Sequence, residues 1–217
     1  MVAGGKPYDA EVEYLESTGT QYIDTLYSYL SPLTARVVID TAPLVVSGVW
    51  TEQGCSGSVW NGPCAGVSSN GVITYALGNS DRNTNASYSA GVRSVFDLDA
   101  VGNRYVVTRV SDGRKLLNLS SLNKAASVNP SRPSFRLFGY VSTGGAMQCR
   151  KVRNYSAKLY DSGVLVRDMI PVRVGAVGAV YDKRGTGGMN PDGSARNDGM
   201  YYNRGTGAFV VGPDITA

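Results

Sequence analysis

Alternation of apolar and polar residues, one by one, is the clearest pattern in this chain. In residues 35–40, Ala35, Val37 and Ile39 would share one face of a strand. Successive side chains of a strand point to opposite sides of its sheet, so the pattern predicts a half-buried β-strand. Further strands are predicted where β-branched and aromatic residues gather between Gly, Pro, Ser and Asn, at residues 134–140, 150–160, 164–170, 176–181 and 208–211.

Two hairpins are predicted from turn residues between strand-forming segments. Residues 103–110 and 115–119 flank Asp112-Gly113, which can adopt the positive φ angles of a tight two-residue turn. A second hairpin turn is predicted at residues 161–163, Asp-Ser-Gly. The chain therefore reads as a series of short antiparallel strands.

Composition agrees with an all-β protein built as one domain. The chain has 217 residues, 42% of them hydrophobic and 18% charged, and its 27 Gly and 9 Pro supply many turns. Only residues 120–126 have helical character, enough for one turn of helix. Without repeats or linkers, we expect a flexible lead of residues 1–7 and a single domain of residues 8–217 built from antiparallel sheets packed face to face.

Two sequence blocks stand at the ends of the chain. The first is residues 13–24, Glu-Tyr-Leu-Glu-Ser-Thr-Gly-Thr-Gln-Tyr-Ile-Asp. The second comprises residues 165–171, 181–182, 205–209 and 212–213. Together they resemble concanavalin A-like (laminin G-like) jelly-roll domains, common in tail and head-appendage proteins of gut bacteriophages and in gut-bacterial surface proteins. The resemblance implies an all-β, two-sheet antiparallel jelly-roll sandwich whose first and last strands pair.

One segment departs from the pattern of that family. Relatives run from the Tyr-Asp pair directly into a short turn, whereas this chain inserts residues 184–199. A segment of this length is expected to be an exposed loop, either a binding surface or a tolerated insertion. Its oxygen-bearing side chains are of the kind that bind calcium, but no set of ligands can be assigned. Asn-Gly and Asp-Gly turns explain the same residues equally well.

Catalytic chemistry has little support in the sequence. The chain has no histidine, which excludes Ser-His-Asp and Cys-His nucleophile systems and mixed Cys/His metal sites. Its four glutamates lack the paired arrangement of glycosidases. Asp97 and Asp99 could form an acid pair or a calcium site, or simply precede a turn. We therefore expect a protein that is not an enzyme.

The cysteines and the positive charges lead to expectations about disulfides and about binding partners. Cys55 and Cys64 could close a small loop as a disulfide, but three free thiols, including Cys149, are the simpler expectation. The net charge is +4, and the only tight group of cations, within residues 150–153, is interpreted as a solvated strand edge. Because the cations are otherwise scattered, no nucleic-acid partner is expected. No membrane insertion is expected either, since no apolar run reaches about 18 residues.

Aromatic and amide side chains suggest carbohydrate binding, because flat rings cover sugar C–H surfaces and amides bind hydroxyls. The chain has 14 Tyr and 2 Trp. The predicted glycan-binding residues lie in the centre of the chain, outside both terminal blocks: Trp50, Trp60, Tyr75, Arg82, Asn83 and Tyr88. Alternatively, the two tryptophans are core or oligomer contacts.

The function that follows is a non-enzymatic, lectin-like appendage protein of a phage or prophage that binds host glycans or decorates the virion. Its partners would be a host surface polysaccharide and other virion proteins. Residues 1–7 lack the apolar core of a signal peptide, which favours the virion; a bacterial cell surface is the alternative. A purely structural capsid or tail module, oligomerising as a trimer, is the second hypothesis, and a glycoside hydrolase or lyase the third.

Overall fold

The structure is a computed structural model that describes residues 5–29, 31–48, 51, 53–54, 62–78, 81–124, 134–141 and 146–215, with the backbone alone for Pro32, Asp81 and Arg82. Regular structure in these ranges is β-strand, apart from a 3₁₀ turn, η1 (Pro32–Thr34). Within them, no helix is long and apolar enough to span a bilayer. The division into a lead of residues 1–7 and a domain of residues 8–217 stays a prediction.

The larger sheet has 11 strands. Its main path is β11 (Lys115–Leu119), β10 (Arg104–Arg109), β9 (Ser94–Asp99), β4 (Ala35–Pro43), β15 (Lys151–Asp161), β16 (Val164–Val174), β17 (Val177–Asp182) and β18 (Met200–Tyr201). Three short strands join it from the chain ends: β1 (Ala10–Glu11), β2 (Leu15–Thr18) and β19 (Val210–Val211).

The smaller sheet has six strands, and β8 is one of its edges. Their order is β3 (Ile23–Asp24), β12 (Arg136–Leu137), β5 (Gln53–Gly54), β6 (Pro63–Val67), β7 (Val72–Leu77) and β8 (Asp81–Ser87). A separate pair comprises β13 (Gly139–Val141) and β14 (Met147–Cys149). The pairings between the strands described are antiparallel, and the chain passes back and forth between the two sheets.

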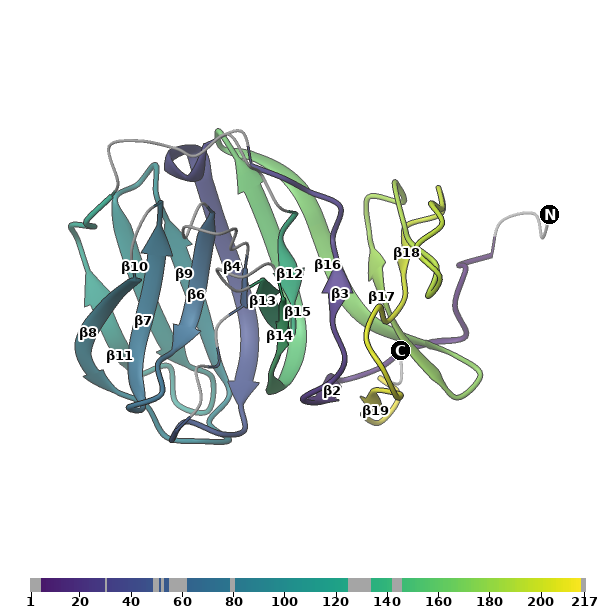
Figure 1. Ribbon diagram of the computed structural model, residues 1–217, viewed down its shortest axis with the longest axis horizontal. Coiled ribbons are helices and arrows are strands. Elements are labelled where there is room, and N and C mark those ends of the chain that lie inside the picture. Colours follow the sequence, from purple (N-terminus) through teal and green to yellow (C-terminus); the bar gives the residue numbers. More distant parts are fainter. Residues whose placement is uncertain are drawn as a thin grey trace.

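The two sheets form the layers of a sandwich, with the core between them (Figure 1). Ile73 and Leu77 of β7 belong to the same buried cluster as Phe96 and Leu98 of β9, so the facing sheets share one apolar interior. The fold class predicted from the sequence, an all-β, two-sheet antiparallel jelly-roll sandwich, is confirmed.

Alternation in the sequence is the reason for this packing. Ala35, Val37 and Ile39 of β4 are at most 1% exposed, while the residues between them are partly solvated. Burying a side chain such as Val or Ile contributes roughly 1.5–3 kcal/mol relative to leaving it in water. A slip of one residue would turn this apolar face outward, so the register of β4 against β15 and β9 is strongly specified.

The two terminal sequence blocks meet in the structure. Glu16 and Leu15 of β2 pair with Val210 and Val211 of β19. Farther along, the hydroxyl of Thr20 donates to the carbonyl of Thr206 at 2.8 Å. The expectation that the first and last strands pair is met only approximately, because the last strand, β19, pairs with the second, β2, while β1 pairs with β16. The contacts between the two blocks still join the ends of the chain.

Charged residues of the terminal blocks form ion pairs within this closure. Glu16 accepts from Arg153 of β15 at 2.6 Å, and Asp24 lies 2.5 Å from Arg136 of β12. These residues link strands that are far apart in sequence. Charged residues of the first terminal block therefore connect neighbouring strands.

The two predicted hairpins differ in detail. Ser162 and Gly163 both have positive φ, 50° and 81°, and join β15 to β16 as the tight turn that was predicted. The turn at Asp112-Gly113 is not a two-residue turn: only Gly113 has positive φ, and the loop runs from residue 110 to 114. Asp112 there forms an ion pair with Arg109, which favours the longer loop.

Of two other local predictions, one was wrong and the other was confirmed only in part. Residues 120–124 form no helix, and residues 125 and 126 lie outside the described ranges. The strand predicted at 134–140 is split into β12 and β13, because Phe138 has a φ of 66°, which a strand cannot continue through. The fully buried ring of Phe138 packs against Phe209 instead, with centroids 4.6 Å apart.

Candidate functional site

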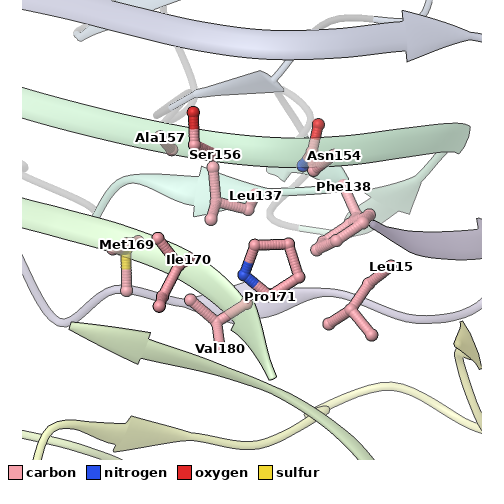
Figure 2. A pocket seen from close by; sticks show the side chains of 10 residues that line it. All are labelled: Leu15, Leu137, Phe138, Asn154, Ser156, Ala157, Met169, Ile170, Pro171 and Val180. Atoms are coloured by element: carbon pink, nitrogen blue, oxygen red, sulfur yellow. The ribbon is translucent and has the colours of Figure 1, made fainter. Parts of the chain in front are cut away.

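A small cavity inside the sandwich is a gap in the core. Its volume is about 10 Å³, room for one water at most. Figure 2 shows apolar side chains converging on it from several strands, among them Leu137, Phe138 and Pro171. The amide of Asn154 in its wall is already satisfied by reciprocal hydrogen bonds with Gln53, at 2.6 and 2.9 Å. This cavity is therefore no ligand site.

A hollow of about 500 Å³ opens at the end of the sandwich. It lies between β8, an edge of the smaller sheet, and β11, an edge of the larger one, which Figure 1 places next to each other. We call it the edge hollow. Its lining residues are Tyr75, Asn83, Thr84, Asn85, Ala86, Leu117 and Leu119.

An enlarged β-bulge, with three residues of one strand opposite one residue of the other, shapes one wall of the edge hollow. Thr74 pairs with Asn83 and Val72 with Ser87, so that between these pairs β7 contributes only Ile73 while β8 contributes residues 84–86. The extra residues bend an edge strand and re-aim its side chains. The bulge therefore brings side chains from both faces of β8 to the hollow.

The hydroxyl of Thr84 holds this bulge. It donates to the carbonyl of Ile73 at 2.8 Å and accepts from the backbone N–H of Ala86 at 3.2 Å. Both groups would otherwise lack a regular ladder partner here. A single side chain thus fixes the local conformation that presents Asn85.

The floor of the edge hollow is apolar and rigid. Tyr75 is 4% exposed and its ring lies edge-on to Tyr105, with centroids 5.6 Å apart. Its hydroxyl accepts from the backbone N–H of Asn123 at 3.0 Å. Leu117 and Leu119 of β11 complete the apolar side. A ligand would meet hydrocarbon below and amides at the rim.

The rim carries the polar chemistry. Asn83 and Asn85 are exposed, and each amide offers two donor hydrogens and one acceptor oxygen. Such groups can bind vicinal hydroxyls, while the apolar floor can cover C–H surface. The combination suits a neutral polyhydroxylated ligand better than an ion.

The structure brings together some of the residues predicted from sequence. Tyr75 and Asn83 both line the edge hollow. Arg82 pairs with Tyr75 through its backbone, and its side chain is not described. Trp50 and Trp60 lie outside the described residues.

Tyr88 has a different environment from the other predicted residues. It is 5% exposed and its ring lies 5.6 Å from that of Phe96 in the core. Its hydroxyl donates to the carbonyl of Val92, and burial raises its pKa to about 12. Any role of Tyr88 in glycan binding would have to be indirect.

Sequence reasoning missed Thr84, Asn85, Leu117 and Leu119. The polar run Asn83-Thr84-Asn85 was a usable signal, because three consecutive amide and hydroxyl side chains offer hydrogen-bonding groups to a ligand. The two leucines gave none, because an apolar residue in a strand is normally a core residue.

The carboxylates considered for catalysis are paired with arginines. Asp97 accepts from Arg36 in a two-pronged contact, both distances 2.9 Å, and Asp99 lies 3.3 Å from Arg104. Asp99 also accepts from the N–H of Gly102 at 2.7 Å, the turn contact considered from sequence. Across the described ranges, no three His, Cys, Asp or Glu residues gather as a metal site would need.

The inserted segment of residues 184–199 is the predicted exposed loop only in part: about half of its residues are exposed, whereas Met189 is 8% exposed and belongs to the core. The segment is also internally bonded. Asp192 accepts from the N–H and hydroxyl of Ser194 at 2.8 and 2.7 Å, a local turn contact. Arg196 forms an ion pair with Asp198. These contacts account for its oxygen-rich side chains without a bound cation.

Asp182, in the second terminal block, is a buried carboxyl beside the closure of the sandwich. Its side chain is 0% exposed, and its Oδ1 accepts from the N–H groups of Asp168 and Arg184 at 3.0 and 3.1 Å. Arg167 lies 3.7 Å from Oδ2, which has no hydrogen bond. Desolvation raises the pKa of Asp182, and the two N–H groups and Arg167 offset part of that rise.

Cys149 is a free thiol. Cys55 lies outside the described residues, so the alternative of a Cys55–Cys64 disulfide stays a prediction.

Comparison with known proteins gives little beyond the fold. No family model matches the chain, and no curated protein matches it. Among solved structures, the native heptameric SAP-like pentraxin of Limulus polyphemus is similar, with 10% sequence identity, a TM-score of 0.42, and coverage of 72% of this chain and 77% of the pentraxin chain.

Proposed function

We propose that this protein is a non-enzymatic, lectin-like module that binds glycans in the edge hollow. The observation that carries the proposal is the β8 bulge, which sets two exposed amides, Asn83 and Asn85, above an apolar floor. The volume, about 500 Å³, is within the range of small-molecule sites. A neutral sugar unit presents the matching pair of surfaces, a C–H face and a hydroxyl rim.

The absence of an enzymatic role is part of the proposal. Each described glutamate has a cationic partner: Glu11 has Lys6, Glu13 has Arg93 and Glu16 has Arg153. None lies in the edge hollow. Binding without turnover is the simplest reading of this arrangement.

We further propose that the module belongs to an appendage of a phage or prophage particle, where it contacts host surface polysaccharide. The resemblance of the terminal blocks to such proteins supports this setting, and the bacterial cell surface is the alternative. Neighbouring tail or head genes would support the first, and polysaccharide-utilisation genes the second.

A glycan array followed by calorimetry tests the binding site. We expect Asn83→Ala and Asn85→Ala each to weaken binding of the best glycan by about tenfold, since each removes hydrogen bonds worth about 1 kcal/mol or more. Asn118→Ala is the matched control, because Asn118 is exposed on β11 and alternates with Leu117 and Leu119, on the opposite face.

Unchanged affinity in both rim variants would contradict the assigned site, and a wild-type protein that binds no glycan would contradict the function. A protein that binds no glycan would favour the second hypothesis, a purely structural capsid or tail module. Its specific support is that β8 and β11 are both edge strands, which another chain could extend. Light scattering would then be expected to show a trimer, whereas a strict monomer would count against that hypothesis.

A further inference from the structure

A second hollow, of about 280 Å³, lies away from the edge hollow. Its lining comes from the end of β2, the start of β15 and the segments before them: Thr18, Gly19, Val45, Thr51, Cys149, Arg150 and Lys151. We call it the basic hollow. None of its lining residues is shared with the edge hollow.

Two adjacent cations in the basic hollow lack a carboxylate partner. Most other arginines of the sandwich have one: Arg36, Arg93 and Arg153 each lie within 4 Å of an Asp or Glu. For Arg150 and Lys151, no such contact exists among the described residues. Of the three cations within residues 150–153, Arg153 is therefore paired with Glu16, whereas Arg150 and Lys151 have no anionic partner among the described residues.

Arg150 is held in place by its neighbours. One N–H of its guanidinium donates to the carbonyl of Cys149 and another to the hydroxyl of Tyr140, both at 3.1 Å. The group also lies 4.9 Å from the centroid of the Tyr140 ring. A guanidinium has five N–H donors, so these bonds leave most of its donors unused.

One of the unused donors of Arg150 is a buried, unsatisfied hydrogen-bond donor. Its Nε is shielded from solvent and has no hydrogen-bond partner. A buried donor without an acceptor typically costs about 1–3 kcal/mol. An anionic acceptor beside this guanidinium would offset that cost, provided that the side chain shifts slightly to expose Nε.

Lys151 is placed by the backbone of the first terminal block. It pairs with Thr18 in the ladder between β15 and β2. Gly19 has a φ of 105°, and a Cβ at that position would come within 3.4 Å of the Lys151 side chain. The aliphatic part of the Lys151 side chain therefore lies beside the turn at Gly19, and Lys151 lines the same hollow as Arg150.

The remaining polar groups neither neutralise the two cations nor repel an anion. Thr18 and Thr51 donate their hydroxyl hydrogens to Gln21 and to the carbonyl of Val67. Burial raises the pKa of the Cys149 thiol, which keeps it protonated and uncharged at neutral pH. The net character of the hollow is that of a cationic site.

We propose that the basic hollow binds an oxyanion group, a sulfate or a carboxylate, carried by an acidic sugar. A planar guanidinium and an adjacent ammonium are the pair of donors that such groups prefer. The choice of a sugar as carrier rests on the proposed function, whereas the anion site does not. A protein with both sites would prefer acidic polysaccharides to neutral ones.

Titration of the full chain with inorganic sulfate, at constant ionic strength maintained with chloride, tests the anion site by calorimetry. We expect saturable binding, weakened up to about fivefold in Lys151→Gln, as for an exposed charge pair. Arg150→Gln should lose about tenfold or more, because its hydrogen bonds to the anion are charge-assisted. Lys115→Gln is the matched control, since Lys115 is exposed on β11, outside the hollow.

Arg150→Gln could also disturb packing on Tyr140, so Lys151→Gln, at an exposed side chain, keeps the test independent of folding. Absence of saturable sulfate binding by the wild-type chain, or equal affinity in Lys151→Gln and Lys115→Gln, would overturn the anion site.

A second arm tests the carrier, with a sulfated monosaccharide, glucuronate and the unsulfated parent sugar. Tighter binding of an acidic sugar than of free sulfate supports the proposal; binding of the free ion alone overturns the sugar as carrier. The two sites can fail separately, because Asn83→Ala should leave sulfate affinity unchanged and Lys151→Gln should leave affinity for neutral glycans unchanged.

Discussion

At the scale of single residues, the place of a side chain in the fold, and not its burial alone, decides whether it can contact a ligand: Tyr75 and Tyr88 are 4% and 5% exposed. Tyr75 and Tyr88 look alike in the sequence, both beside Asn- and Ser-rich segments. In the fold, Tyr75 lines a hollow, whereas Tyr88 packs on Phe96 and donates to a backbone carbonyl. The sequence could supply the residue types of the site, but not the faces on which they lie, because those depend on pairing with distant strands.

The buried carboxyl of Asp182 gives a pH-dependent prediction. Its folded pKa is raised above the ordinary value of 3.8, so the folded state holds the proton to higher pH than the unfolded chain does. The stabilisation linked to this proton is complete below pH 3.8 and is lost as pH rises through the folded pKa. Asp182→Asn keeps an acceptor for the two N–H groups and removes this titration.

Urea unfolding at a series of pH values from 3.5 to 7 would measure the effect. The wild type loses this stabilisation as pH rises, and the variant does not. We therefore expect the free energy of unfolding of Asp182→Asn to increase relative to that of the wild type as pH rises. Parallel pH profiles for the two proteins would show that the carboxyl titrates alike in both states. Asp192 lies in an exposed local turn where hydrogen bonds lower its carboxyl pKa. The free energy of unfolding of Asp192→Asn should therefore decrease relative to that of the wild type as pH rises.

At the scale of elements, alternation predicted strands well and could not predict irregularities. The strands β4, β15 and β17 follow from local sequence, and so does the tight turn at Ser162-Gly163. The bulge in β8 does not, because it exists only relative to β7. The split of β12 from β13 likewise depends on Phe138 reaching Phe209, which lies far away in sequence.

The β8 bulge yields a prediction about Thr84. Thr84→Val keeps the shape of the side chain but removes the hydroxyl that bonds Ile73 and Ala86. We expect a loss of about 1 kcal/mol in the free energy of unfolding and faster hydrogen exchange at Ala86. Glycan affinity should fall as well, because Asn85 is no longer held in its conformation.

Thr108→Val, on β10, serves as the control for the loss of a strand hydroxyl. If Thr84→Val exchanges and binds like the control, the hydroxyl is not what holds the bulge.

At the scale of the whole molecule, the chain ends close the sandwich. The resemblance of the terminal blocks predicted this closure, and the pairing of β2 with β19 agrees with it. The surroundings of Gly205 explain why a glycine is suited to the second block, because a Cβ there would overlap the carbonyl of Thr20. The blocks thus account for the scaffold, while both proposed ligand sites draw mainly on other parts of the chain.

Gly205→Ala tests the importance of this closure. The overlap with backbone atoms leaves no flexible side chain to give way, so we expect a loss of about 2–4 kcal/mol in the free energy of unfolding. Gly175→Ala is the control: its φ of 58° is unfavourable for alanine, as that of Gly205 is not, but its Cβ would meet no atom within 4 Å. A loss in Gly205→Ala no larger than that in Gly175→Ala would show that the overlap with Thr20 contributes little.

The central claim is that glycans bind in the edge hollow. Amide chemical-shift mapping, with the neutral glycan that binds best on an array, tests it most directly. We predict the largest shifts at the side-chain amides of Asn83 and Asn85 and at the backbone of residues 84–86 and 117–119. Saturable binding that leaves these signals unmoved would contradict the account.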